Sequence, residues 1–106
     1  MTELPTPAVI ALRERQEGGD LSALEIVNAY ITQVEAQEDK VQAFAWFDAE
    51  YARAQAQALD AHRMRGLPLG PLHGIPVALK DIIDTKAIPT ENGTPIDAGR
   101  VPKRDA

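Results

Sequence analysis

The sequence contains no cysteine. Disulfides, thiolate metal sites and cysteine nucleophiles are therefore excluded, and a reducing compartment is permitted. No apolar run approaches the ~20 residues that cross a bilayer. The acidic start Met1-Thr2-Glu3 has neither the basic region nor the apolar core of a signal peptide. These absences lead us to expect a soluble, cytoplasmic chain that has no membrane contact.

Positive charge is also in short supply, because 11 lysines and arginines face 16 aspartates and glutamates, for a net charge of -5. A nucleic-acid backbone attracts basic surfaces, so we expect no nucleic-acid partner for this segment. The pattern Gly-x-x-x-x-Gly-Lys of phosphate loops is missing, and neither Asp81 nor Asp84 is joined by a histidine at a ligand spacing. We therefore expect neither a cofactor nor a metal.

Serine is scarce: Ser22 is the only serine among the 106 residues. It opens the stretch Ser22-Ala23-Leu24-Glu25, which has the form of a capping box, in which the serine and the glutamate satisfy free amides at a helix start. This structural role accounts for Ser22. It is not a candidate nucleophile.

Three helices are predicted from such signals. The pair Thr6-Pro7 looks like an N-cap followed by proline at the first helical position, and Gly18-Gly19 stops that helix. The second helix begins after Ser22 and should end near Gln37. Its apolar stripe at helical spacing consists of Leu24, Val27, Ile31 and Val34.

The third helix runs from the N-cap Asp48 to about Arg65, with Gly66 as the expected C-cap. Between the second and third helices, residues Val41 to Phe47 alternate in a way that indicates a short strand or an extended connector.

A loop rich in glycine and proline then leads into an apolar segment that carries Lys80. Alternate side chains of a strand fall on opposite faces, and both faces of residues 75–83 are largely apolar. Such a pattern suits a strand covered on both sides, so we expect an α/β fold in which Lys80 points into a protected layer. An ammonium group there must find partners or give up its proton. The alternative is a strand-end lysine that reaches water or pairs with Asp81 or Asp84.

Other polar residues near this segment have simpler interpretations. His73 stands between turn residues, and this position is more typical of a histidine that makes hydrogen bonds within a loop than of a catalytic base. His62 falls near the end of the third helix, where we expect it to be solvated or favoured by the helix dipole. Asp81 and Asp84 are better explained as solvated or loop-orienting carboxylates than as metal ligands.

The predicted strand has no strong second strand to pair with, and the chain after Asp84 is rich in turn residues. We therefore expect residues 1–106 to be the N-terminal fragment of a single domain, incomplete on its own. It would comprise a helical lead-in (1–66), a loop and lysine-bearing strand (67–84) and a loop region (85–106). The missing strands would come from more of the same polypeptide or from a second chain.

One motif covers the loop and the start of the expected strand: Gly70-Pro71-Leu72-His73-Gly74-Ile75-Pro76-Val77, then Leu79-Lys80-Asp81. This motif resembles the N-terminal part of amidase signature enzymes, which include general amidases and the A subunits of glutamyl-tRNA amidotransferases. The likeness also extends to the capping-box segment and to the later loop, where Ala87 stands in place of a usual glycine and Thr94 in place of a usual serine.

This resemblance implies a serine–serine–lysine triad on a mixed α/β sheet flanked by helices, and it implies that Lys80 is the catalytic lysine. The substrate would be a small-molecule amide whose carbon–nitrogen bond is hydrolysed. Both serines would lie beyond Ala106, so the isolated chain should be inactive.

Two alternatives remain open. The chain could be non-catalytic and act by docking or self-association, as a homo-oligomer or with a complementing C-terminal segment. It could also be part of an amidotransferase subunit that delivers ammonia toward an aminoacyl-tRNA.

Overall fold

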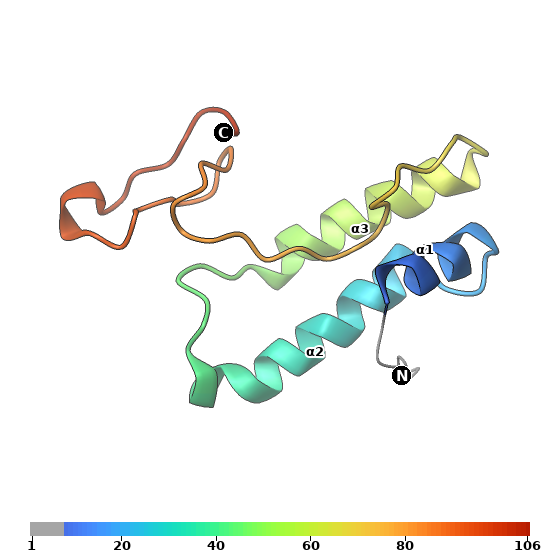
Figure 1. Cartoon of the computed structure of the whole chain (residues 1–106), viewed down its shortest axis with the longest axis horizontal. Helices are drawn as coiled ribbons and strands as arrows, with labels where there is room; N and C mark the ends of the chain where they lie inside the picture. The colour runs from blue at the N-terminus through green and yellow to red at the C-terminus, as the bar shows by residue number, and fades with distance from the viewer. Residues whose placement is uncertain (1–7) are drawn as a thin grey trace. The chain divides into compact units, whose positions relative to one another are not determined.

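The computed structural model describes residues 8–106, which contain three α-helices, one short 3₁₀ turn and no β-strand (Figure 1). The helices are α1 (Val9–Glu17), α2 (Ala23–Val41) and α3 (Ala49–Met64), and the 3₁₀ turn is η1 (Pro95–Asp97). Within this part of the chain, no helix combines the length and the apolar character needed to cross a membrane. The residues form two units, one containing 8–42 and 48–76 and the other 43–47 and 77–106.

Helix α1 begins after Ala8 and ends at Gly18, whose amide donates to the Glu14 carbonyl at 2.9 Å, while the Gly19 amide donates to the Gln16 carbonyl at 3.1 Å. The predicted stop at Gly18 is therefore confirmed, whereas the predicted start at Thr6-Pro7 lies outside the described residues. Leu12 and Gln16 are the buried residues of this helix.

Helix α2 begins with the predicted capping box, because the Ser22 hydroxyl accepts from the Glu25 amide at 3.0 Å and the Glu25 carboxylate accepts from the Ser22 amide at 3.2 Å. The helix does not end near Gln37 but continues to Val41. Gln42 then takes a left-handed conformation with φ 50° and closes the helix as its C-cap. The predicted end was wrong because no glycine or proline interrupts residues 37–41.

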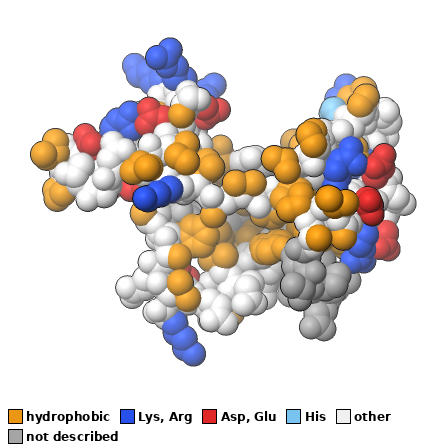
Figure 2. All heavy atoms as spheres, viewed as in Figure 1, with side chains coloured by type: hydrophobic (Ala, Val, Ile, Leu, Met, Phe, Trp, Pro, Cys, Tyr) orange, Lys and Arg blue, Asp and Glu red, His pale blue; other side chains and the backbone are white. Residues whose placement is uncertain are grey.

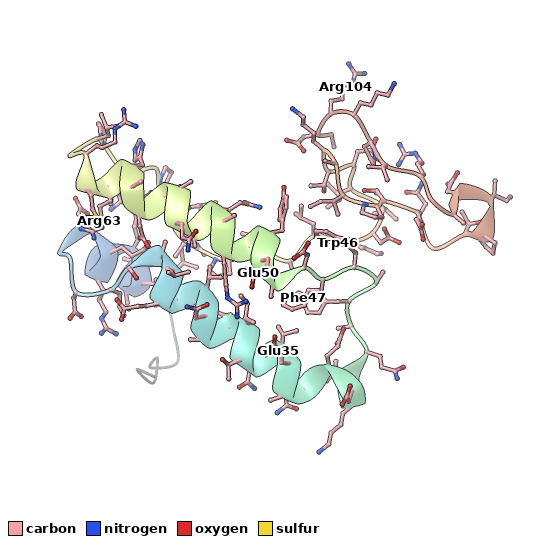
Figure 3. The ribbon with its side chains drawn as sticks, turned by 180° about the vertical axis from the view of Figure 1, so that it is seen from behind. Glu35, Trp46, Phe47, Glu50, Arg63 and Arg104 are labelled. Carbon is pink, nitrogen blue, oxygen red and sulfur yellow. The ribbon has the colours of Figure 1, made fainter. Side chains whose placement is uncertain are left out.

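Helix α3 starts at the predicted cap, where the Asp48 carboxylate accepts from the Tyr51 amide at 3.1 Å. Its C-cap is Arg65, one residue before the glycine that we expected. Residues 42–48 connect α2 to α3 without a strand; Trp46 and Phe47 lie on this connection (Figure 3), where the Phe44 and Phe47 rings are 5.3 Å apart.

The core of the helical unit consists of Leu12, Leu21 and Ile26, and Tyr30 and Ile75 pack against it. Helices α2 and α3 also pack on each other, and Ala56 is the buried residue of α3. The predicted stripe of α2 was only partly right: Ile31 is buried, but Leu24, Val27 and Val34 are half-buried. The fully buried position is Ile26, since that face meets Leu12 and Leu21.

The α/β prediction is wrong for this chain. Residues 75–80 have no regular secondary structure, a turn follows at 81–82, and no sheet exists within residues 8–106. A strand needs a neighbour to satisfy its backbone groups, and the described residues offer none. The apolar alternation that indicated a covered strand belongs instead to a segment whose side chains Val77, Leu79 and Ile82 are exposed.

The second unit is held by backbone hydrogen bonds between loops. The Thr90 amide donates to the Arg100 carbonyl at 3.0 Å, and the Ala87 amide donates to the Pro102 carbonyl at 3.0 Å. Within residues 77–106, η1 is the sole helical element.

Candidate functional site

The glycine- and proline-rich loop that carries the family resemblance is fastened to two helices by side chains that donate to its backbone. We call residues 68–74 the motif loop. From α1, Arg13 donates Nε to the Gly70 carbonyl at 3.0 Å and Nη2 to the Leu69 carbonyl at 3.1 Å. From α3, His62 donates Nε2 to the Pro68 carbonyl at 2.8 Å, because a carbonyl can only accept.

Gln16 of α1 also holds this loop. Its side chain is fully buried, and its Nε2 donates to the His73 carbonyl at 2.9 Å. Gly74 has φ +68°, and a Cβ atom built there would lie 1.9 Å from the Gln16 Oε1. Only glycine fits this position, for its backbone conformation and for the space that Gln16 fills.

His73 is buried between these contacts, with 6% of its surface exposed. Its backbone amide donates to the Gly70 carbonyl at 3.2 Å, but its ring Nε2 finds no hydrogen-bond partner within residues 8–106. The ring centroid lies 6.0 Å from that of His62. Burial lowers the pKa of His73 below its usual value, and the neighbouring His62 lowers it further.

His62 and His73 both border a mostly apolar, open hollow of about 570 Å³ in the helical unit. Ala58 and Leu59 of α3 line one part of it, and Gly70, Pro71 and Leu72 of the motif loop line another. The prediction for His62 as a simple solvated residue was incomplete, since it is half-buried and holds the loop.

Lys80, the predicted catalytic residue, lies in the other unit and is exposed. The structure therefore does not place it in the protected layer that the strand prediction gave. Its carbonyl accepts from the Ile83 amide at 3.0 Å, and its side chain makes no hydrogen bond or ion pair to any described residue. Figure 2 shows that hydrophobic side chains are exposed on the surface; beside Lys80 in sequence they are Val77, Leu79, Ile82 and Ile83.

The two aspartates after Lys80 orient loops, as predicted. The Asp81 carboxylate accepts from the Glu91 amide at 3.0 Å. Asp84 forms a two-pronged ion pair with Arg100, at 2.7 and 2.9 Å. The hydrogen bond from Arg100 lowers the pKa of Asp84, and the same contact raises the pKa of Arg100. In residues 8–106 no three potential ligands gather to hold a metal.

Sequence reasoning missed Arg13 and Gln16. Both lie on α1, three residues apart, and residues at that spacing share a helix face. A polar pair on the same side as the buried Leu12 was a signal that this face contacts backbone carbonyls rather than water alone.

The motif loop and Lys80 both fall within a match to a known protein family. The family model named amidase matches residues 25–106. The chain belongs to the amidase family. The match leaves out α1, and with it Arg13 and Gln16.

The amidase-family chain is similar to the A subunits of glutamyl-tRNA(Gln) amidotransferases. It is 48% identical to the A subunit of Streptomyces coelicolor over 83% of this chain and 18% of the relative. With the A subunit of Salinispora arenicola the identity is 42% over the whole of this chain and 22% of the relative. The chain thus spans about a fifth of the length of these relatives, in their N-terminal portion.

A solved structure shares the fold, with a TM-score of 0.87 and 30% identity, over 94% of this chain and 22% of that one. It is described as a vestigial protein complex that reveals the evolutionary origins of an s-triazine catabolic enzyme.

Proposed function

We propose that this chain is the N-terminal portion of a single amidase domain that hydrolyses carbon–nitrogen amide bonds, and that Lys80 is its catalytic base. The observation that carries the proposal is the family match over residues 25–106, which contains the motif loop and Lys80 together. In the proposed mechanism Lys80 accepts a proton through a bridging serine, and a second serine attacks the amide carbonyl. Water then hydrolyses the acyl-enzyme.

Both serines must come from outside this chain, because Ser22 caps α2 and no other serine is present. Lysine works as a base near neutral pH only where burial disfavours its charged form. The Lys80 side chain is exposed. We therefore expect the isolated chain to be inactive, on two independent grounds.

The surroundings of Lys80 support a role for further polypeptide. Val77, with 66% of its surface exposed, Leu79 and Ile82 leave a continuous apolar segment uncovered around this lysine. Covering apolar surface is favourable by about 25 cal/mol per Å². The matched relatives have about four-fifths of their length beyond what this chain spans. We propose that the corresponding polypeptide covers residues 77–83 and desolvates Lys80.

A second candidate is favoured by the names of the relatives, which are amidotransferase subunits at 42% and 48% identity. In that case the hydrolysed amide supplies ammonia that is delivered toward an aminoacyl-tRNA, with help from a partner protein. The chemistry at Lys80 would be the same. Recovery of a B-type amidotransferase subunit with the native protein from its source would favour this candidate, whereas a stable, active preparation without it would favour the simple amidase.

The role of Lys80 can be tested in a chimera in which this chain replaces the matching portion of the Salinispora relative, purified with that protein's own partner subunits. Ammonia release from glutamine is the readout. We expect Lys80→Ala to lower kcat by about 10²–10⁴-fold, the usual contribution of a general base.

The matched control is Lys86→Ala. Lys86 is a lysine six residues later, and its structural contact is made by its backbone amide to Asp105, which the substitution leaves in place. Its kcat should stay within about twofold of the parent chimera. An active Lys80→Ala chimera would overturn the assignment of Lys80.

A further inference from the structure

The motif loop is attached to the helices around a buried histidine that has an unsatisfied ring nitrogen. The backbone carbonyl of His73 accepts a hydrogen bond from Gln16. Earlier in the same loop, Arg13 and His62 donate to the Gly70 and Pro68 carbonyls. Its Nε2 has no partner within the described residues. A neutral imidazole tolerates such a place far better than an imidazolium, which needs water or an anion.

The charged groups around His73 also disfavour a positive charge on its own ring. From α3 it faces His62 and Arg63, and from α1 it faces Arg13; Asp60 of α3 is the one carboxylate among its neighbours in the described part of the chain. Arg63 is near the C-terminal end of α3 (Figure 3).

Asp60 is already engaged, because its two oxygens accept from the Ala23 and Leu24 amides at 2.7 and 3.0 Å. It is therefore poorly placed to turn toward a protonated His73.

We propose that His73 makes the attachment of the motif loop sensitive to acid: protonation of its ring releases residues 68–74 from α1 and α3. This device lies in the helical unit and does not depend on amide hydrolysis. It would regulate the loop that precedes Lys80 in the sequence.

The direction follows from proton linkage. Burial and the nearby cations lower the pKa of His73 below the ordinary value of 6.5. The unfolded or detached loop then binds a proton more readily than the attached loop. Attachment is strongest above pH 6.5 and weakens as the pH falls through the lowered pKa of His73. One proton changes the equilibrium by at most ~tenfold per pH unit.

The test is hydrogen exchange of the 106-residue chain, followed by NMR between pH 7.5 and pH 5 and expressed as protection factors. The reporters are the side-chain N–H groups that join the loop to α1: Gln16 Nε2, which donates to the His73 carbonyl, and Arg13 Nε, which donates to the Gly70 carbonyl. We call their protection the loop protection, and we expect it to fall by up to ~tenfold per pH unit below pH 6.5. The Ile26 amide at the start of α2 should keep its protection, because local release does not unfold the helices.

The matched variants are His73→Gln and Arg63→Gln. Glutamine at position 73 is polar and does not titrate, so its loop protection should be flat over the same range. Arg63→Gln removes a cation that faces His73 and should move the loss of protection to higher pH. The proposal is overturned by a pH-independent wild type, by an equal loss in His73→Gln, by an equal loss at Ile26, or by an unprotected loop at pH 7.5.

Should His73→Gln fail to fold, the ring proton resonances of His73 in the wild-type chain decide the matter. A titration midpoint below 6.5 that coincides with the loss of loop protection supports the device. A midpoint at 6.5 or above overturns it.

Discussion

The two units of this chain are stabilised in different ways. The helical unit has a buried apolar core at Leu12, Leu21 and Ile26. In residues 43–47 and 77–106, no large apolar side chain is buried, and order comes from backbone hydrogen bonds and the Asp84–Arg100 ion pair. The unit of residues 43–47 and 77–106 has apolar residues in a strand-like pattern, but these side chains are exposed as in a loop. We have proposed that further polypeptide covers them.

The contrast is most directly tested by truncating one apolar side chain in each unit. Ile26 is fully buried, and Ile26→Ala should lower the free energy of unfolding by about 2–5 kcal/mol through lost burial and a residual cavity. Val77→Ala removes an exposed side chain and should change it by less than about 0.5 kcal/mol. Urea unfolding followed by far-UV circular dichroism gives both values. Similar losses for the two variants would contradict the division into a packed unit and an uncovered one.

A glycine in the helical unit offers the second test. Gly74→Ala places a Cβ atom against the buried Gln16 and forces an L-residue to φ +68°, so we expect a loss of about 2–4 kcal/mol in the same unfolding experiment. Gly66 is the matched control, since its φ is +74° and a Cβ atom there would meet nothing within 4 Å. Gly66→Ala should cost about 1 kcal/mol, the backbone penalty alone. Equal costs would mean that Gln16 does not hold the motif loop as the structure indicates.

The same contrast explains what the sequence could predict. Local signals placed the helices well: Ser22 and Asp48 cap α2 and α3 as their residue types require. The apolar alternation of residues 75–83 indicated a covered strand, but strand formation depends on a partner that no local pattern reveals. The motif singled out Lys80 as a candidate, and that role stays a prediction. Its exposure could not be predicted, because burial depends on what else packs there. The anchoring of the motif loop joins residues 57 positions apart, as from Gln16 to His73, and lay beyond any local signal.

The smallest expected effect is in the second unit, where one departure from the family pattern carries backbone strain. Ala87 stands where the family usually has glycine, and it adopts φ +64° while its amide donates to the Pro102 carbonyl. A non-glycine residue in the left-handed conformation destabilises the folded chain by about 1–2 kcal/mol. Glycine removes this penalty, but it loses more conformational entropy on folding, so the net gain in stability is smaller. Ala87→Gly should therefore stabilise the loop by about 0.5–1 kcal/mol.

The Thr90 amide, which bonds to the Arg100 carbonyl, is the reporter for this loop. Its hydrogen exchange should slow by about two- to fivefold in Ala87→Gly. Thr94→Ser is the matched control at the other departure, because serine keeps the hydroxyl that accepts from the Ile96 amide at 3.4 Å. That variant should leave the exchange of Thr90 unchanged. If Ala87→Gly failed to slow exchange, the strain at this position would not limit the order of the loop, and covering polypeptide would be the stronger source of its stability.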